Sequence, residues 1–188
     1  MKLRIISGSL KGRYINVPQL KTTRPTTDRV KETVFNILWN HIDLDGINVL
    51  DLYSGSGSLG FEAASRGASG VDFVEDNFNA AKVIEANIKQ LELENICAVF
   101  KRAVSSFTAI PAVKPYDLIL ADPPFFKDDI YEAVNNIFTN KLLSDSGLLF
   151  IERSVQTLSK DKENLGVEPY KRAGDACLYF IRADRSGL

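Results

Sequence analysis

The sequence has few of the residues that build metal centres and disulfide frameworks. It contains two cysteines, Cys97 and Cys177, which lie far apart in apolar runs, and one histidine, His41. There is no CxxC pair, and a single histidine is too few to complete the usual set of zinc ligands. We therefore expect free thiols and no metal ion.

Long apolar runs are also missing. Runs such as 118–121 and 148–151 are far too short to cross a bilayer, and the amino terminus lacks the apolar stretch of a signal peptide. The chain has 188 residues, of which 45% are hydrophobic and 25% charged, as in an ordinary globular protein. From these features we expect a cytoplasmic protein, and we take it to be a monomer.

Positive charge is concentrated at the amino terminus. Residues 1–31 hold eight lysines and arginines against one acid, Asp28, whereas the remainder carries 15 basic and 23 acidic residues. A cationic segment on an acidic body is typical of a nucleic-acid-binding surface, because binding is driven by release of counterions from phosphates. A merely solvated basic face explains the charge run equally well.

The same amino-terminal region has the pattern of a small appendage. Two short apolar segments, 3–6 and 14–17, flank the polar, glycine-bearing segment 7–13, and this arrangement predicts a β-hairpin. We divide the chain into a basic N-terminal hairpin or arm, 1–25, and a main domain, 26–188.

The main domain is predicted to begin with a helix. Thr26 or Thr27 can cap it, and Asp28 lies in its first turn, where a negative charge suits the helix dipole. Trp39, at its end, is expected in the core. The helix carries an amphipathic stripe made of Val30, Val34, Ile37 and Leu38.

From residue 47 onward, apolar strand-like runs alternate with helical patterns. Repeated strand–helix units with short connections predict an α/β fold in which a mostly parallel sheet is covered by helices on both faces. Ligands of such sheets bind beyond the carboxyl ends of the strands. A last apolar run can add an edge strand. The expected strands are 49–52, 71–75, 98–101, 117–121, 148–152 and 177–181.

A glycine-rich segment, 51–60, lies where the first parallel strand should turn into its helix. Its spacing matches a dinucleotide fingerprint, and Glu75, at the end of the next strand, could bind a ribose of NAD or of S-adenosylmethionine. Asp51 favours the second cofactor, since a carboxylate before the loop repels a pyrophosphate but suits a cationic amino-acid group. A tight turn without a ligand is the remaining alternative. The glycines are Gly55, Gly57 and Gly60.

A second motif, Asp122-Pro123-Pro124-Phe125, directly follows the expected strand 117–121. Two prolines fix the backbone and remove two N–H donors, which leaves carbonyls and the Asp122 carboxylate as acceptors. Two acceptors aimed at an exocyclic base amine would free its lone pair to attack a sulfonium methyl group. Phe125 can stack on the base, so a paired target would have to be flipped out. The alternative is a rigid proline turn with a core phenylalanine.

Together these residues resemble the RsmD-type 16S rRNA guanine-N2 methyltransferases of bacteria, over almost the whole chain. The glycine loop and the Asp-Pro-Pro-Phe tetrapeptide are shared across many amino-methyltransferases, whereas the Arg-Pro-Thr-x-Asp-Arg segment is much narrower. Tyr53 and Ser54 depart from the family, which commonly has Phe-Ala before Gly-x-Gly. The motifs are segments 4–8 and 11–13, 24–32, 35–38, 51–60, 73–75 and 122–125.

The resemblance implies a Rossmann-like class I methyltransferase fold of seven strands with its final hairpin reversed, and S-adenosylmethionine as cofactor. It implies 16S rRNA, presented by an assembling small ribosomal subunit, as partner. The catalytic residues would be Asp122, Pro123, Pro124 and Phe125. The cofactor would contact Asp51, Tyr53, Ser54, Gly55, Ser56, Gly57, Glu75, Asp76, Arg102 and Ala103, the last two near the adenine. RNA would be held by Arg4, Lys11, Arg13, Arg24 and Arg29.

Three rival interpretations stay open at this point. An amino-methyltransferase acting on DNA or on another base would use the same tetrapeptide, because adenine N6, cytosine N4 and guanine N2 are similar amines. An NAD-linked oxidoreductase would need a catalytic side chain near the hydride, and His41 lies at the polar end of the first helix. A non-catalytic RNA-binding factor could keep the fold without the reaction.

Overall fold

The computed structural model describes residues 1–18, 28–124 and 127–187. Most of the chain builds one seven-stranded sheet with the strand order β5, β4, β3, β6, β7, β9, β8. Neighbouring strands from β5 to β7 are parallel, whereas β9 runs antiparallel to both β7 and β8. This is the predicted sheet with its reversed final hairpin. The strands are β3 (Asn48–Leu52), β4 (Gly70–Val74), β5 (Cys97–Phe100), β6 (Tyr116–Ala121), β7 (Leu143–Ser154), β8 (Lys171–Ala173) and β9 (Ala176–Arg182).

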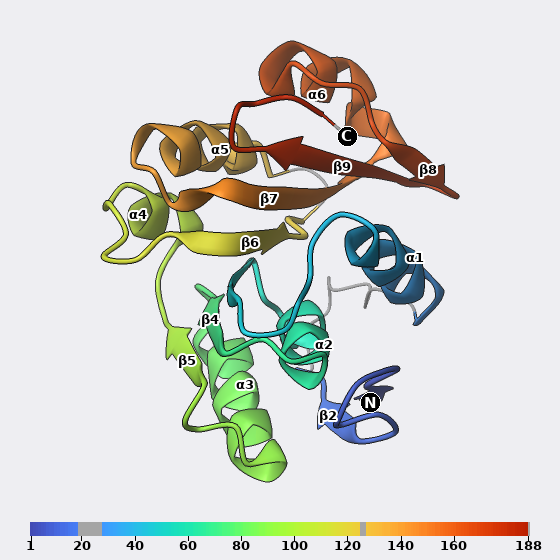
Figure 1. The fold of residues 1–188 in the computed structure, drawn as a ribbon, viewed down its shortest axis with the longest axis vertical. Coiled ribbons are helices and arrows are strands. Elements are labelled where there is room, and N and C mark those ends of the chain that lie inside the picture. Colours follow the sequence, from blue (N-terminus) through green and yellow to red (C-terminus); the bar gives the residue numbers. More distant parts are fainter. Residues whose placement is uncertain (19–27, 125–126, 188) are drawn as a thin grey trace.

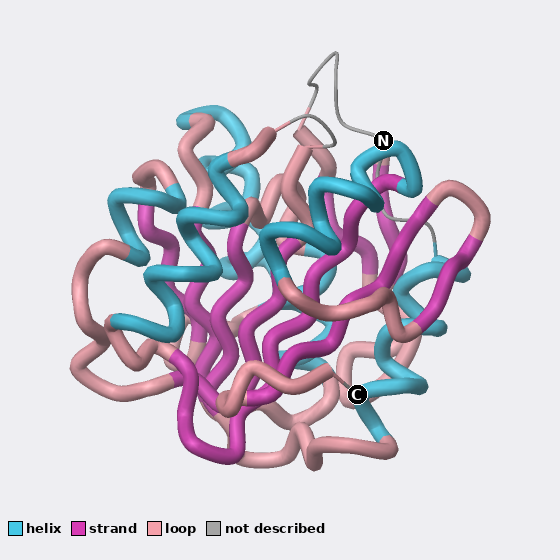
Figure 2. The backbone as a smooth tube through the Cα atoms, turned by 90° about the horizontal axis from the view of Figure 1, so that it is seen from above, coloured by secondary structure: helices cyan, strands magenta, loops and turns pink. Residues whose placement is uncertain are grey.

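Helices cover both faces of this sheet (Figures 1 and 2). One core lies under α1 (Asp28–Trp39), α2 (Ser58–Ser65) and α3 (Phe78–Leu91), and the other under α4 (Val104–Thr108), α5 (Asp129–Thr139) and α6 (Leu158–Leu165). Side chains of each strand alternate between the two cores, as on any pleated sheet. A short 3₁₀ turn, η1 (Val155–Thr157), joins β7 to α6. Among the described residues, no helix is long and apolar enough to cross a membrane.

The predicted amino-terminal hairpin is present as β1 (Lys2–Arg4) and β2 (Tyr14–Asn16), and it lies beside α2 (Figure 1). Its Ile5 and Ile15 are buried in the core under α1 to α3. Glu62 of α2 accepts hydrogen bonds from the Ile6 and Ser7 amides at 3.0 Å each. The hairpin is therefore fixed to the sheet domain by packing and by a buried carboxylate.

The hairpin loop approaches α2 too closely for a side chain at its tip. Gly8 has a φ of 81°, and a Cβ there would lie 1.8 Å from the Ser65 carbonyl oxygen. Ser65 also binds the loop, since its Oγ accepts from the Leu10 amide at 2.9 Å. The buried side chain of Lys31 joins α1 to the hairpin by donating to the Arg4 carbonyl at 2.8 Å. The division at residue 25 stays a prediction, because 19–27 lie outside the described residues.

Two sequence-based expectations are wrong: Trp39 is not in the core, and the run 177–181, expected as an edge strand, belongs to β9, which lies between β7 and β8. Trp39 is 69% exposed. It follows Leu38, which is buried, and successive helical residues point about 100° apart, so Trp39 leaves the buried stripe. The helix itself begins at Asp28, with the expected caps Thr26 and Thr27 outside the described residues. Three short elements, α4, α6 and β8, were not predicted. Both cysteines are free thiols, as expected.

Candidate active site

The parallel strands end level with one another, and this edge gathers the predicted site. Leu52 of β3 is in register with Val74 of β4 and with Ala121 of β6, and Val74 is in register with Phe100 of β5. The residues that follow these strand ends therefore share one edge. They include Tyr53, Glu75 and Asp122, together with Arg102 and Ala103 a step further along.

The glycine loop has a backbone that few other residues could adopt. Tyr53, Gly55 and Gly57 have φ angles of 56°, 55° and 76°, in the left-handed region that favours glycine. Gly60, in the first turn of α2, packs so closely that a Cβ there would lie 2.3 Å from the Phe73 ring. The loop therefore turns tightly onto the start of α2, with Ser56 half-buried within it.

Asp51 is the most deeply buried carboxylate of the site, at 2% exposure. Its Oδ2 accepts a hydrogen bond from the Gly60 amide at 2.9 Å. Burial raises the pKa of Asp51 well above its usual value, and the charges of Asp122 and Glu75 add to this effect, while the Gly60 hydrogen bond opposes it. Three carboxylates thus converge where a positive charge would stabilise all of them.

Glu75 joins the glycine loop to the turn that follows β4. Its two carboxylate oxygens accept from the Gly55 amide and from the Asn77 amide, each at 2.8 Å. Burial raises the pKa of this carboxyl, although the two amides act in the opposite direction. The Ser54 hydroxyl, in the glycine loop, donates from Oγ to the Asp51 carbonyl at 2.6 Å. The carboxylate expected to hold a ribose is therefore already oriented by the backbone.

A lysine that the sequence analysis did not single out links the segment after β4 to α5. The Lys127 ammonium lies 3.2 Å from Asp76 Oδ2 and 3.5 Å from Asp129 Oδ2, and 5.7 Å from the centre of the Tyr53 ring. The Tyr53 hydroxyl donates to Asp129 at 3.1 Å. Burial opposes the charge of Lys127, but both carboxylates outweigh it and raise its pKa. Asp76 is exposed and Glu75 is buried, yet the two carboxylates lie close enough together for Asp76 to raise the pKa of Glu75.

The tetrapeptide after β6 lies at the same edge. Asp122 is half-buried and close enough to Asp51 to raise the pKa of that carboxyl. Pro123 is buried and Pro124 exposed, whereas Phe125 lies outside the described residues. The Lys127 amide donates to the Pro124 carbonyl at 2.9 Å, which closes the end of this connection.

The residues expected near the adenine differ in environment. Arg102 is exposed, and its amide donates to the Phe100 carbonyl at 3.0 Å. Ala103 is half-buried and immediately precedes α4 with an extended backbone. Both lie beyond the end of β5, on the Glu75 side of the site.

The predicted RNA-contacting residues that the structure describes lie on the hairpin and on α1. Arg4, Lys11 and Arg13 are exposed on the hairpin, and Arg29 is exposed on the first turn of α1. Arg13 donates to the Gln90 carbonyl at 3.0 Å, so part of its hydrogen-bonding capacity is used within the protein. Arg24 lies outside the described residues. Within the described parts of the chain, no cluster of three or more potential metal ligands occurs.

Comparison with known proteins places this chain in a family. The model of the family described as conserved hypothetical protein 95 matches residues 3–182. The chain belongs to this family. It is 33% identical over 187 residues to "Ribosomal RNA small subunit methyltransferase D" of Escherichia coli K12, with 99% of this chain and 92% of that protein covered. The protein of the same name from Haemophilus influenzae is 36% identical over 153 residues, covering 80% of this chain and 78% of that protein.

Solved structures share the fold of this chain. The structure of yhhF, a methyltransferase candidate from E. coli, has a TM-score of 0.80 at 32% identity and covers 96% of this chain and 97% of its own. A ribosomal protein L11 methylase from Lactobacillus delbrueckii has a TM-score of 0.67 at 18% identity, over 83% of this chain and 80% of its own, and shares the fold alone. The resemblance to RsmD-type enzymes drawn from the motifs is confirmed.

Proposed function

We propose that this chain is an S-adenosylmethionine-dependent methyltransferase that methylates the exocyclic N2 amine of a guanine in small-subunit rRNA. The observation that carries the proposal is the convergence of Asp51, Glu75 and Asp122 at one sheet edge, beside the glycine loop. The relatives named as ribosomal RNA small subunit methyltransferases support the reaction and the class of substrate.

The charge of the site suits this cofactor better than a dinucleotide. Burial, together with the charges of Asp122 and Glu75, raises the pKa of the Asp51 carboxyl, so a cation beside it would be stabilising, and S-adenosylmethionine carries an ammonium and a sulfonium. A pyrophosphate would need free amides at the start of α2, but the Gly60 amide is bonded to Asp51. The donor set therefore fits S-adenosylmethionine and disfavours NAD.

The residues of the loop and the strand ends divide the work of binding. Asp51 would hold the cationic amino-acid end, and Glu75 would accept from the ribose hydroxyls, exchanging its present backbone donors or sharing them. Tyr53, Ser54, Ser56 and the two loop glycines would line the methionine part, with Asp76, Arg102 and Ala103 toward the ribose and adenine. When bound, the cofactor supplies an electrophilic methyl group.

Asp122 would then act on the methyl acceptor. An exocyclic amine presents two N–H donors, and the Asp122 carboxylate and the Pro123 carbonyl are acceptors fixed by the prolines. Accepting hydrogen bonds from both N–H groups draws the nitrogen toward tetrahedral geometry and frees its lone pair for attack, and the one proton that the amine loses on methylation can pass to the Asp122 carboxylate. Phe125 would stack on the same base. The exposed basic side chains of the hairpin and α1, with Arg24, would hold the RNA phosphates around the target.

The test is incubation of the protein with methyl-labelled S-adenosylmethionine and unmodified small-subunit particles or free rRNA, followed by nucleoside digestion and mass spectrometry. We expect labelled N2-methylguanosine, and its loss in Asp122→Ala while cofactor affinity stays within about threefold. Label on an adenine or cytosine amine would keep the mechanism and move the substrate. No label on any nucleic acid, despite measured cofactor binding, would refute the proposal.

A further inference from the structure

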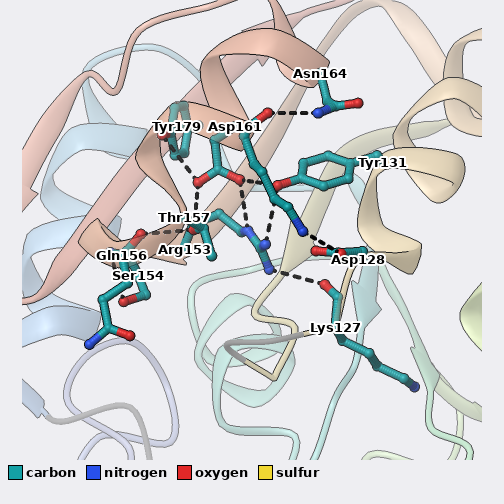
Figure 3. Close-up of polar contacts among 11 residues, drawn as sticks. Lys127, Asp128, Tyr131, Arg153, Ser154, Gln156, Thr157, Asp161, Asn164 and Tyr179 are labelled. Atoms are coloured by element: carbon teal, nitrogen blue, oxygen red, sulfur yellow. Dashed lines mark hydrogen bonds and ion pairs between the residues drawn. The ribbon is translucent and has the colours of Figure 1, made fainter.

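A buried ion pair lies behind the tetrapeptide, between β7 and α6 (Figure 3). Arg153, near the end of β7, donates from Nε to Asp161 Oδ1 at 3.1 Å, and both side chains are 0% exposed. Hydroxyl groups from three elements complete the shell of Asp161. They are Tyr131 at 2.8 Å, Thr157 at 2.7 Å and Tyr179 at 3.4 Å.

Stability alone does not explain why this pair is retained. Desolvation of two buried charges offsets most of their attraction, so apolar residues of similar volume often serve the fold as well or better. In some proteins a buried polar or ionic group fixes one geometry, and that role is our hypothesis for this pair. The pair in this chain has the donors to do that, because a guanidinium presents five N–H groups in a rigid plane and Asp161 engages one edge of it.

The rest of the Arg153 guanidinium faces the connection that starts at Asp122. Its Nη1 donates to the Lys127 carbonyl at 3.3 Å, and its Nη2 donates to the Tyr131 hydroxyl at 3.4 Å. The amide of the same Lys127 donates to the Pro124 carbonyl at 2.9 Å. A chain of two hydrogen bonds therefore runs from the buried guanidinium, through one peptide unit on each side of Lys127, to the second proline of the tetrapeptide.

The Arg153–Asp161 pair is also placed to restrain the segment that leads into α5. Ile151 of β7 pairs with Ala121, the last residue of β6, so Arg153, two residues further along β7, lies level with the start of the connection that follows β6. Tyr131, one turn into α5, donates to Asp161, and burial together with Asp161 raises its pKa to about 12, so it remains a donor. The segment between Lys127 and Tyr131 is thus fixed at both ends by one ion pair.

We propose that Arg153, oriented by Asp161, is a positioning residue for the methyl-acceptor site. Arg153 sets the distance between the Asp122–Pro124 segment and the glycine loop. This inference rests on the proposed function of that segment. Lys127 has a part in it, because its main chain is bonded by Arg153 while its side chain contacts Asp76 and Asp129 at the cofactor side.

Three variants separate positioning from support of the fold. Arg153→Met removes the whole interaction. Arg153→Lys keeps a cation for Asp161 but has no planar fork to reach Lys127 at the same time, and it is the variant to use if the methionine protein does not fold. Tyr179→Phe is the matched control, because it removes a hydroxyl from the same Asp161 shell without any contact to Lys127.

The readouts are kcat, KM for RNA, cofactor Kd, thermal unfolding and hydrogen exchange of the 127–131 amides in the ligand-free protein. For both Arg153 variants we expect kcat to fall at least about tenfold, with KM and Kd changed less than about threefold, since small displacements of reacting groups are costly. The 127–131 amides should exchange faster. Tyr179→Phe should lower the unfolding temperature with kcat within about twofold of wild type.

Two results would overturn the inference. One is a kcat within about twofold of wild type in folded Arg153→Lys, and the other is an equal loss of kcat in Tyr179→Phe and the Arg153 variants. If the wild-type protein methylates no RNA, the proposed function itself fails. The hydrogen-exchange data still test whether Arg153 restrains the 127–131 segment. Faster exchange in the Arg153 variants alone then supports the positional restraint, and unchanged exchange refutes it.

Discussion

Replacing Asp51 by asparagine should make the ligand-free protein more stable and the proposed cofactor complex weaker. The substitution keeps an acceptor for the Gly60 amide and removes a charge that is 2% exposed and is repelled by Asp122 and Glu75. Binding sites are often built from such locally unfavourable arrangements, which a ligand then compensates. The two effects have opposite signs, which makes the prediction a sharp test of a binding role.

The magnitudes and the pH dependence follow from the structure. A hydrogen bond to a charged partner contributes about 1.5–3 kcal/mol, so S-adenosylmethionine should bind roughly 10- to 150-fold more weakly to Asp51→Asn. Because the pKa of Asp51 is raised on folding, the folded state retains this proton at a pH where the unfolded chain has lost it. The contribution of Asp51 to wild-type stability therefore falls as the pH rises from about 4 through that raised pKa. The gain from the asparagine should be small near pH 4 and larger near pH 8.

Isothermal titration with S-adenosylmethionine and urea unfolding at several pH values measure the two quantities. Asp72→Asn is the matched control, because burial also raises the pKa of Asp72. Asp72 lies in the middle of β4, away from the strand ends, and accepts a hydrogen bond from the Tyr116 hydroxyl. Its cofactor affinity should equal that of wild type. If Asp51→Asn lowers stability at pH 8 together with affinity, Asp51 is a structural residue and the charge argument is wrong.

Three further outcomes are expected. Gly60→Ala should destabilise the protein by about 1–2 kcal/mol, because the strain of the new methyl group against Phe73 exceeds the gain in helix propensity. A double-mutant cycle with Phe73→Leu should show a coupling free energy of about 1 kcal/mol, and additive effects of the two substitutions would refute the contact. Glu62→Gln leaves one hairpin amide without its acceptor, so the urea midpoint should fall by an amount equivalent to about 1–3 kcal/mol; an unchanged midpoint would mean that the hairpin is held by packing alone. Lys11→Ala should weaken RNA binding and reduce the slope of log K against log salt by roughly 0.7–0.9, whereas an unchanged slope would remove Lys11 from the RNA surface.

The strand-edge chemistry was predictable because it depends on local patterns. Apolar runs of strand length, glycines that need left-handed backbone and a double proline after a strand each limit the local structure, and parallel topology then brings their ends together. Asp51, Glu75 and Asp122 were therefore predicted to share an edge, as the strand register shows. Their mutual effect on the pKa of Asp51 needed the coordinates.

The buried ion pair was not predictable, for a physical reason. Asp161 lies in a stretch of lysines and acids that has the composition of a solvated helix, and Arg153 follows an apolar strand where a polar end is expected. Burial of charged side chains depends on which elements pack over them, here α5, α6 and β9. Charge in the sequence is weak evidence of exposure when three elements can close over it.

The helix α2 links the glycine loop of the proposed cofactor site to the hairpin proposed to bind RNA. Its first turn donates the Gly60 amide to Asp51 beside the glycine loop, and its last residue, Ser65, binds the Leu10 amide of the hairpin loop. Eight helical residues span about 12 Å, and a helix of that length does not stretch. If the hairpin binds RNA phosphates, α2 would hold them at a fixed distance from the glycine loop. The guanine that reaches Asp122 would then be selected by its distance along the RNA from those phosphates, as well as by the hydrogen-bonding groups of the base.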